Sequence, residues 1–281
     1  MRDDGIDTLK GALIFLVVFG HLIETGLQDG GVVRAAYLAI YLVHMPLFVA
    51  VSGYLTKPQI DPARFVKGLI IPLILAEAAY RLFDLLLLQS GSSLIAPYWL
   101  LWFLWSLLCW RLLLPFWMKL PVPLALAFVA SLAAGAVEAI GYAFSLSRTI
   151  YFFPFFILGH QLAGRKLPAG NMWVVPVIVL ALMVLGIGFL PAEVSHRWLF
   201  GSLPYAAFEV SDIAGAAIRA AIYAASLVAG FAVVMLLPRQ DATLAVLGRA
   251  SLAVYVGHGL VVLMLPYPSV RSISTTSLCP T

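Results

Sequence analysis

Two ionisable side chains lie eleven residues apart in an otherwise apolar run near the N-terminus. Lys10 and His21 are the ends of the stretch Lys-Gly-Ala-Leu-Ile-Phe-Leu-Val-Val-Phe-Gly-His. In an α-helix, eleven steps of about 100° make about three turns, so both side chains share one face, roughly 16 Å apart along the axis. Ionisable groups inside a membrane are costly and usually mark function. A base at mid-membrane and a cation near one surface therefore predict chemistry carried out across a membrane.

The composition is that of a membrane protein with several spans. Of the 281 residues, 63% are hydrophobic and 11% are charged, whereas soluble domains have about half apolar and about a quarter charged residues. The basic residues flank apolar runs and form no separate basic domain, so we expect no nucleic-acid partner. The two cysteines predict no disulfide framework. The sequence contains no metal-ligand cluster and no P-loop, and we expect no metal.

Nine apolar segments approach the length of about 20 residues that a bilayer core of about 30 Å requires. They are continuous and lack strand-like alternation, which predicts an all-α, polytopic transmembrane helix bundle. Residues 1–265 then form one membrane-embedded domain. Residues 266–281 are polar and patternless, and are either a disordered tail or the mark of a truncated or frame-altered chain. The predicted spans cover residues 9–27, 36–55, 66–88, 98–118, 122–143, 148–164, 173–190, 213–237 and 243–265.

The distribution of basic residues predicts a multi-pass protein of the cell (inner) membrane with a cytoplasmic N-terminus. In that orientation all five lysines lie at the cytoplasmic face. The opposite face keeps four arginines, which are Arg34, Arg148, Arg197 and Arg271. Membrane lipids are then expected partners of the apolar helix faces.

A second histidine is expected at the depth of His21. His21 lies about 18 Å from the cytoplasmic end of its helix, and His44 lies about 12 Å from the outer end of the next helix. Because a short loop joins these helices, the two imidazoles could share one cavity. Pro46 frees backbone carbonyls beside His44, and Gly53 permits close approach of another helix. The alternative is that each histidine is a core residue hydrogen-bonded to the backbone or to water.

Three cations follow the second span, and they suit an anionic ligand such as a phosphate. They are Lys57, Arg64 and Lys67. The alternative is that they only reflect the excess of basic residues on the cytoplasmic side.

Further charged groups lie in or near the spans. Arg148 opens a predicted helix at the outer side, where it either anchors the helix by snorkelling or steers a polar acceptor. We expect Arg81, Asp84 and Arg111 to pair within the bundle. Glu24 lies on the stripe of His21, and His258 lies in the outer half of the last span.

Several short motifs, in this order, resemble the acyltransferase 3 family of integral membrane acyltransferases, and most closely its fucose 4-O-acetylase-like branch. They are Asp7-x-x-Lys10-Gly11 with His21, His44-x-Pro46-Leu47-Phe48 with Ser52-Gly53-Tyr54, Trp102-Phe103-Leu104, Arg148 with Phe155-Phe156-Ile157-Leu158-Gly159, and Ser251-Leu252-Ala253-Val254-Tyr255 with His258.

The resemblance implies a bundle of about ten helices that moves an acyl group, usually acetyl, from cytosolic acyl-coenzyme A to a hydroxyl of a sugar or other cell-envelope acceptor. His21 matches the essential membrane histidine of the family. Lys10 stands where many members have arginine, which keeps the charge but loses the bidentate fork. Arg64 and Lys67 loosely match a basic pair that many members carry after the second helix.

The resulting hypothesis places the phosphates of acetyl-coenzyme A near Lys57, Arg64, Lys67 and Lys10. His21 then acts as a general base on the acceptor hydroxyl or forms a transient acyl-imidazole, with His44 as its partner. Arg148, Glu24 and His258 are the expected acceptor side. The alternatives are a transporter of small molecules or lipid-linked sugars, and an inactive truncated relative. The acceptor, whether lipid-linked sugar, polysaccharide, peptidoglycan or small metabolite, stays open.

Overall fold

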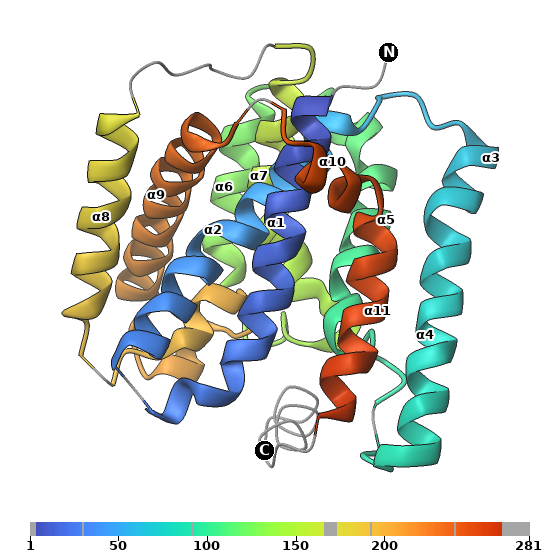
Figure 1. Cartoon of the computed structure of the whole chain (residues 1–281), viewed down its shortest axis with the longest axis horizontal. Helices are drawn as coiled ribbons and strands as arrows, with labels where there is room; N and C mark the ends of the chain where they lie inside the picture. Colours follow the sequence, from blue (N-terminus) through green and yellow to red (C-terminus); the bar gives the residue numbers. More distant parts are fainter. Residues whose placement is uncertain are drawn as a thin grey trace.

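In the computed structural model, residues 4–29, 31–91, 93–165, 173–191, 193–238 and 240–265 are described. Every regular element in these ranges is a helix, which confirms the predicted all-α class (Figure 1). The principal helices are α1 (Asp4–Ile23), α2 (Gly31–Leu55), α3 (Pro62–Phe65), α4 (Ile71–Phe83), α5 (Trp102–Trp117), α6 (Pro123–Ala134), α7 (Leu146–Gln161), α8 (Val174–Gly188), α9 (Asp212–Leu236), α10 (Ala242–Arg249) and α11 (Ser251–Met264).

Short 3-10 and π-helical segments connect or extend these helices. The 3-10 segments are η1 (Glu24–Asp29), η4 (Trp99–Leu101), η5 (Ala143–Ser145), η6 (His196–Phe200) and η7 (Tyr205–Phe208), and the π segments are η2 (Val66–Ile70) and η3 (Asp84–Leu88). Because η2 and η3 adjoin α3 and α4 without a break, residues 62–88 form one continuous helix.

Among the described residues, four helices are long and apolar enough to cross a membrane: α1, α2, Trp99–Trp117 and α9. The pair α10–α11 also passes this test but bends by 77° between its two helices. The predicted number of nine spans is therefore not confirmed. The expected span 122–143 holds only the twelve-residue helix α6, because the chain turns after Ala134 and the ring of Tyr205 packs against Gly135.

The expected span 243–265 is a bent pair because α10 lies against α1. The Asp241 carboxylate accepts a hydrogen bond from the Leu244 amide at 2.8 Å and so caps the start of α10. At its end, Gly248 approaches the Asp7 carbonyl so closely that a Cβ would lie 1.8 Å from that oxygen. This contact fixes α10 across the start of α1, and α11 then continues in a new direction.

The core lies around α7, where nine of sixteen residues are buried. Glycine pairs α7 closely with α2: a Cβ on Gly53 would lie 2.0 Å from the Phe156 carbonyl oxygen, and one on Gly159 would lie 1.8 Å from the Ala50 carbonyl oxygen. Only glycine allows the two backbones to meet in this way. The expected close approach of a helix at Gly53 is therefore confirmed.

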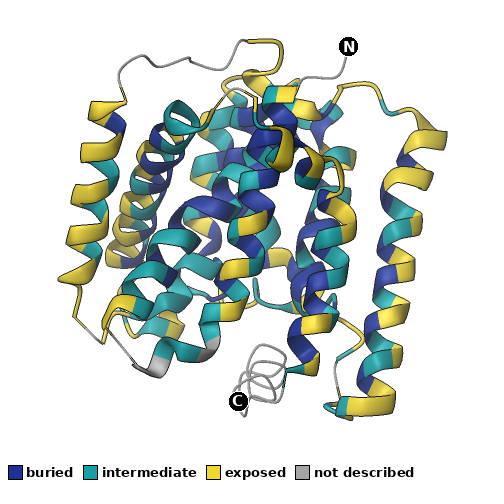
Figure 2. Cartoon of the chain, viewed as in Figure 1, coloured by how far each residue is buried: buried dark blue, intermediate teal, exposed yellow. Residues whose placement is uncertain are grey.

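The outermost helices expose apolar side chains, as expected for surfaces in contact with lipid. Figure 2 shows exposed residues along α8 and α4, which lie at opposite sides of the bundle in Figure 1. Leu75 and Leu86 on the continuous helix 62–88, and Leu182 on α8, are each more than half exposed. The predicted tail 266–281 lies outside the described residues, as do Arg2, Lys166 and Arg239.

Candidate active site

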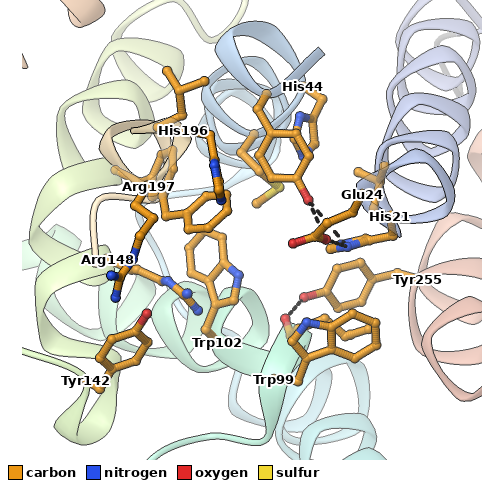
Figure 3. A pocket seen from close by; sticks show the side chains of 17 residues that line it. His21, Glu24, His44, Trp99, Trp102, Tyr142, Arg148, His196, Arg197 and Tyr255 are labelled. Atoms are coloured by element: carbon orange, nitrogen blue, oxygen red, sulfur yellow. Dashed lines mark hydrogen bonds and ion pairs between the residues drawn. The ribbon is translucent and has the colours of Figure 1, made fainter. Parts of the chain in front are cut away.

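A cavity of about 350 Å³ opens between α1, α2, α5, α7, α11 and η6, and we call it the His21 cavity (Figure 3). His21 and His44 both line it, as the depth estimate predicts. Its lining is formed by Val17, His21, Glu24, Tyr41, His44, Met45, Trp99, Leu100, Trp102, Tyr142, Arg148, Phe152, His196, Arg197, Leu199, Phe200 and Tyr255.

His21 is paired with a carboxylate at the end of its own helix. Its Nδ1 lies 3.3 Å from Oε2 of Glu24, and both side chains are largely buried. The Tyr41 hydroxyl lies 3.4 Å from the same Nδ1 and the same carboxylate oxygen. A carboxylate can only accept, so it favours the tautomer with the proton on Nδ1. Nε2 of His21 is then the unprotonated nitrogen, as a general base requires.

Aromatic rings fix the orientation of the His21 imidazole. The Trp99 ring lies edge-on at 5.1 Å between centroids, and the His258 ring stacks at 5.5 Å. Trp99 has φ = 34°, a left-handed conformation that is rare for an aromatic residue. Strain of this kind persists where surrounding packing imposes it, often at functional sites.

The other two expected histidines are held by their own helices. His44 Nδ1 lies 2.8 Å from the Ile40 carbonyl oxygen, and His258 Nδ1 lies 3.0 Å from that of Val254. His44 thus contributes to the cavity wall while its Nδ1 is satisfied by the backbone. His258 stacks on the His21 ring but does not line the cavity. Its Nε2 is one of the few buried polar atoms of the described chain without a hydrogen-bond partner.

The wall opposite His21 is cationic and aromatic (Figure 3). The Arg148 guanidinium lies over the rings of Trp102 and Tyr142, at 5.4 Å and 5.3 Å from their centroids. Arg197 and His196 come from η6. Burial lowers the pKa of His196 below its ordinary value; Glu24 opposes this shift, and the positive charges of Arg197 and Arg34 reinforce it.

A second cavity, of about 370 Å³, contains Lys10 and is called here the Lys10 cavity. Lys10 Nζ lies 3.2 Å from Oδ1 of Asp7, which confirms the expected pairing. Tyr255 lines both cavities, and its hydroxyl donates a hydrogen bond to the Leu100 carbonyl. The two residues that share a stripe of α1 therefore belong to two cavities with a common wall.

Arg111 is a cation of the Lys10 cavity whose expected partner is missing. Arg81 does pair, with Glu77, and the Asp84 carboxylate accepts a hydrogen bond from the Ser90 hydroxyl at 2.6 Å. Arg111 instead lies over the Phe65 ring, 5.0 Å from its centroid. Its buried Nε has no hydrogen-bond partner among the described residues. The expectation that Arg111 pairs within the bundle is therefore wrong at its Nε atom.

The three expected coenzyme-binding cations lie at the protein surface. Lys57 and Lys67 are exposed, and the Arg64 side chain is 84% exposed and 3.2 Å from Asp61. None of them lines the Lys10 cavity, but Gly68 and Leu69 next to Lys67 do. Lys57 and Lys67 thus adjoin lining residues of that cavity in sequence, Arg64 does not, and none of the three lies inside it.

Thirteen of the seventeen lining residues of the His21 cavity are not among the site residues predicted from sequence, and they include Tyr41, Tyr142, His196 and Arg197. Tyr41 lies three residues before His44 on α2, which is the one signal that could have found it. The sequence places Arg197 at the outer face, but no local pattern marks His196 or Arg197 as a site residue. Within the described ranges, no group of three or more His, Cys, Asp or Glu side chains could hold a metal ion.

Comparison with known proteins identifies the family. The model of the acyltransferase 3 family, described as an acyltransferase domain, matches residues 3–275. Nodulation protein NolL of Sinorhizobium fredii is 36% identical over 122 residues, and NolL of Mesorhizobium japonicum is 30% identical over 122 residues. Each match covers 36% of this chain and 33% of the relative, so the matched region spans about a third of the relatives' length. No solved structure matches the chain significantly. The chain belongs to the acyltransferase 3 family, whose model matches nearly its whole length.

Proposed function

We propose that the chain is an integral membrane O-acyltransferase that moves an acetyl group from cytosolic acetyl-coenzyme A to a hydroxyl of a cell-envelope acceptor. The observation that carries this proposal is that Tyr255 lines both the Lys10 cavity and the His21 cavity, so that the two cavities adjoin. A cationic cavity on one side and a histidine–carboxylate pair on the other suit a donor and an acceptor that approach from opposite faces.

The donor side is supported by charge. Coenzyme A carries phosphates at one end and the thioester at the other. Lys10 and Arg111 line the interior of the Lys10 cavity and suit a phosphate that enters it, whereas the surface cations Lys57, Arg64 and Lys67 suit the phosphates that stay outside. Arginine and lysine are the usual side chains for phosphate binding. The acyl chain would then extend toward Tyr255 and His21.

The acceptor side is supported by the pairing of His21 with Glu24. In the proposed reaction the acceptor hydroxyl transfers its proton to Nε2 of His21 while its oxygen bonds to the thioester carbonyl carbon. The carbon–sulfur bond then breaks, and the coenzyme A thiolate takes a proton from the imidazolium. Glu24 stabilises the imidazolium that forms in between, as a carboxylate beside a catalytic histidine does.

The proposed location is the cell (inner) membrane with the N-terminus in the cytoplasm. The starts of α1 and α3, which carry Lys10 and Arg64, lie at the same end of the bundle (Figure 1). That arrangement agrees with the positive-inside rule for a cytoplasmic end.

The test uses the full chain in inside-out membrane vesicles, with acetyl-coenzyme A labelled in the acetyl group. The proposal expects release of coenzyme A thiol and transfer of label to a component of the vesicle interior. A transporter would move a solute without releasing thiol, and this result would overturn the proposal.

A further inference from the structure

Arg148 and Arg197, like Arg111 in the Lys10 cavity, differ from Arg81, Arg219 and Arg34 in how their charge is met. Arg81 pairs with Glu77. Arg219 donates to two backbone carbonyls, at 2.8 Å and 3.3 Å, and Arg34 donates to three loop carbonyls. Within the described ranges, the guanidinium groups of Arg148 and Arg197 have no hydrogen bond and no ion pair. Arg148 only stacks on two aromatic rings.

The His21 cavity therefore carries unbalanced positive charge. Among the described residues of its wall, Glu24 is the one acidic residue, and its carboxylate is engaged by His21 and Tyr41. Arg148 and Arg197 stand across the cavity from this pair (Figure 3). Between low-dielectric walls, such a charge attracts anions more strongly than it would in water. The free guanidinium donors suit a carboxylate or phosphate, which they can bind in a bidentate manner.

The His21 cavity also offers aromatic faces on both sides. Trp102 and Tyr142 stack on Arg148, and Trp99 lies beside His21. Tryptophan and tyrosine combine a large apolar face with a polar edge, which suits the C–H face and hydroxyl rim of a pyranose ring. A volume of about 350 Å³ accommodates a small saccharide.

We propose that the His21 cavity takes an anionic saccharide, whose phosphate or carboxylate binds Arg148 and Arg197 while a hydroxyl on the opposite side of the sugar faces His21. This inference rests on the proposed function, because it names the class of acceptor for that reaction. Arg148 and Arg197 on one side of the cavity then bind the anionic group, and His21 on the other side takes part in the reaction.

The experiment measures binding without turnover. Purified full-length chain in detergent is titrated calorimetrically with glucose 1-phosphate, with glucose and with inorganic phosphate. We expect glucose 1-phosphate to bind at least about tenfold more tightly than either of the others. Arg148→Gln and Arg197→Gln should each weaken this binding about tenfold, and Arg148→Lys should weaken it less. Lys119→Gln, which removes an exposed charge outside both cavities, should leave it unchanged.

Three results would overturn the inference: equal binding of glucose and glucose 1-phosphate, equal binding of inorganic phosphate alone, or binding that both glutamine variants retain. Unfolding temperatures show whether each variant is folded, and Arg197→Gln removes no side-chain hydrogen bond or ring contact of the described chain. His21→Ala should keep the binding, so loss of acetyl transfer and loss of acceptor recognition are separate outcomes. A last titration uses glucose linked to citronellyl diphosphate. If the natural acceptor is lipid-linked, this compound should bind more tightly than glucose 1-phosphate; if it is soluble, it should not.

Discussion

Nδ1 of His21 lies 3.3 Å from Oε2 of Glu24, one turn further along the chain and just past the end of α1. The carboxylate comes from the first residue of η1, where the chain leaves the α-helix. This break lets Glu24 face the imidazole from beyond the helix end. In the proposed reaction this pair is the base and the group that orients it, whereas Nδ1 of His44 is bound to the Ile40 carbonyl.

Replacing Glu24 by Gln should slow acetyl transfer roughly 10²-fold, because the neutral amide no longer fixes the tautomer of His21 or stabilises the imidazolium. The measurement is the initial rate of thiol release from acetyl-coenzyme A. Glu138→Gln, at an exposed position, is the matched control and should keep the normal rate. A Glu24→Gln enzyme with the normal rate would exclude the carboxylate from catalysis.

Arg111→Gln should raise the KM for acetyl-coenzyme A about tenfold and change kcat little, because a half-buried guanidinium with an unsatisfied Nε gains most from an anionic partner. Arg64→Gln removes a solvated charge that already has Asp61 nearby. It should raise KM by no more than about threefold. The reverse order of the two effects would place the phosphates outside the Lys10 cavity.

Gly53→Ala should destabilise the protein by roughly 2 kcal/mol, because its methyl group would overlap the Phe156 carbonyl and force α2 and α7 apart. Gly186→Ala is the control, since a methyl group added to this glycine of α8 would meet no neighbouring atom within 4 Å. That variant should be neutral or slightly stabilised. Thermal unfolding in detergent measures both, and equal unfolding temperatures would contradict the close packing.

Stability should fall as the pH drops from 7 toward 5, in part through His196. Its pKa is lowered by burial in the folded state, so the unfolded chain binds the proton more readily and gains population as the pH falls below about 6.5. His196→Gln should therefore show a smaller loss of unfolding temperature over this range. An identical pH dependence in both proteins would mean that His196 is not desolvated.

The sequence was sufficient for the features that depend on helix periodicity and depth. It predicted the shared cavity of His21 and His44, the pairing of Lys10 with Asp7, and the helix contact at Gly53. It could not predict the bend between α10 and α11, since that depends on a tertiary contact between Gly248 and α1. Arg197 reaches the cavity through a loop, whose path has no periodic pattern in sequence.

The role of His21 as the base of acetyl transfer is tested most directly by the rate of thiol release in His21→Ala. The control is His160→Gln, which alters a histidine bonded to the Thr56 carbonyl, outside the lining of both cavities. We predict that His21→Ala inserts normally, binds acetyl-coenzyme A and loses acetyl transfer, whereas His160→Gln retains it. Full activity in the His21→Ala protein would contradict the account.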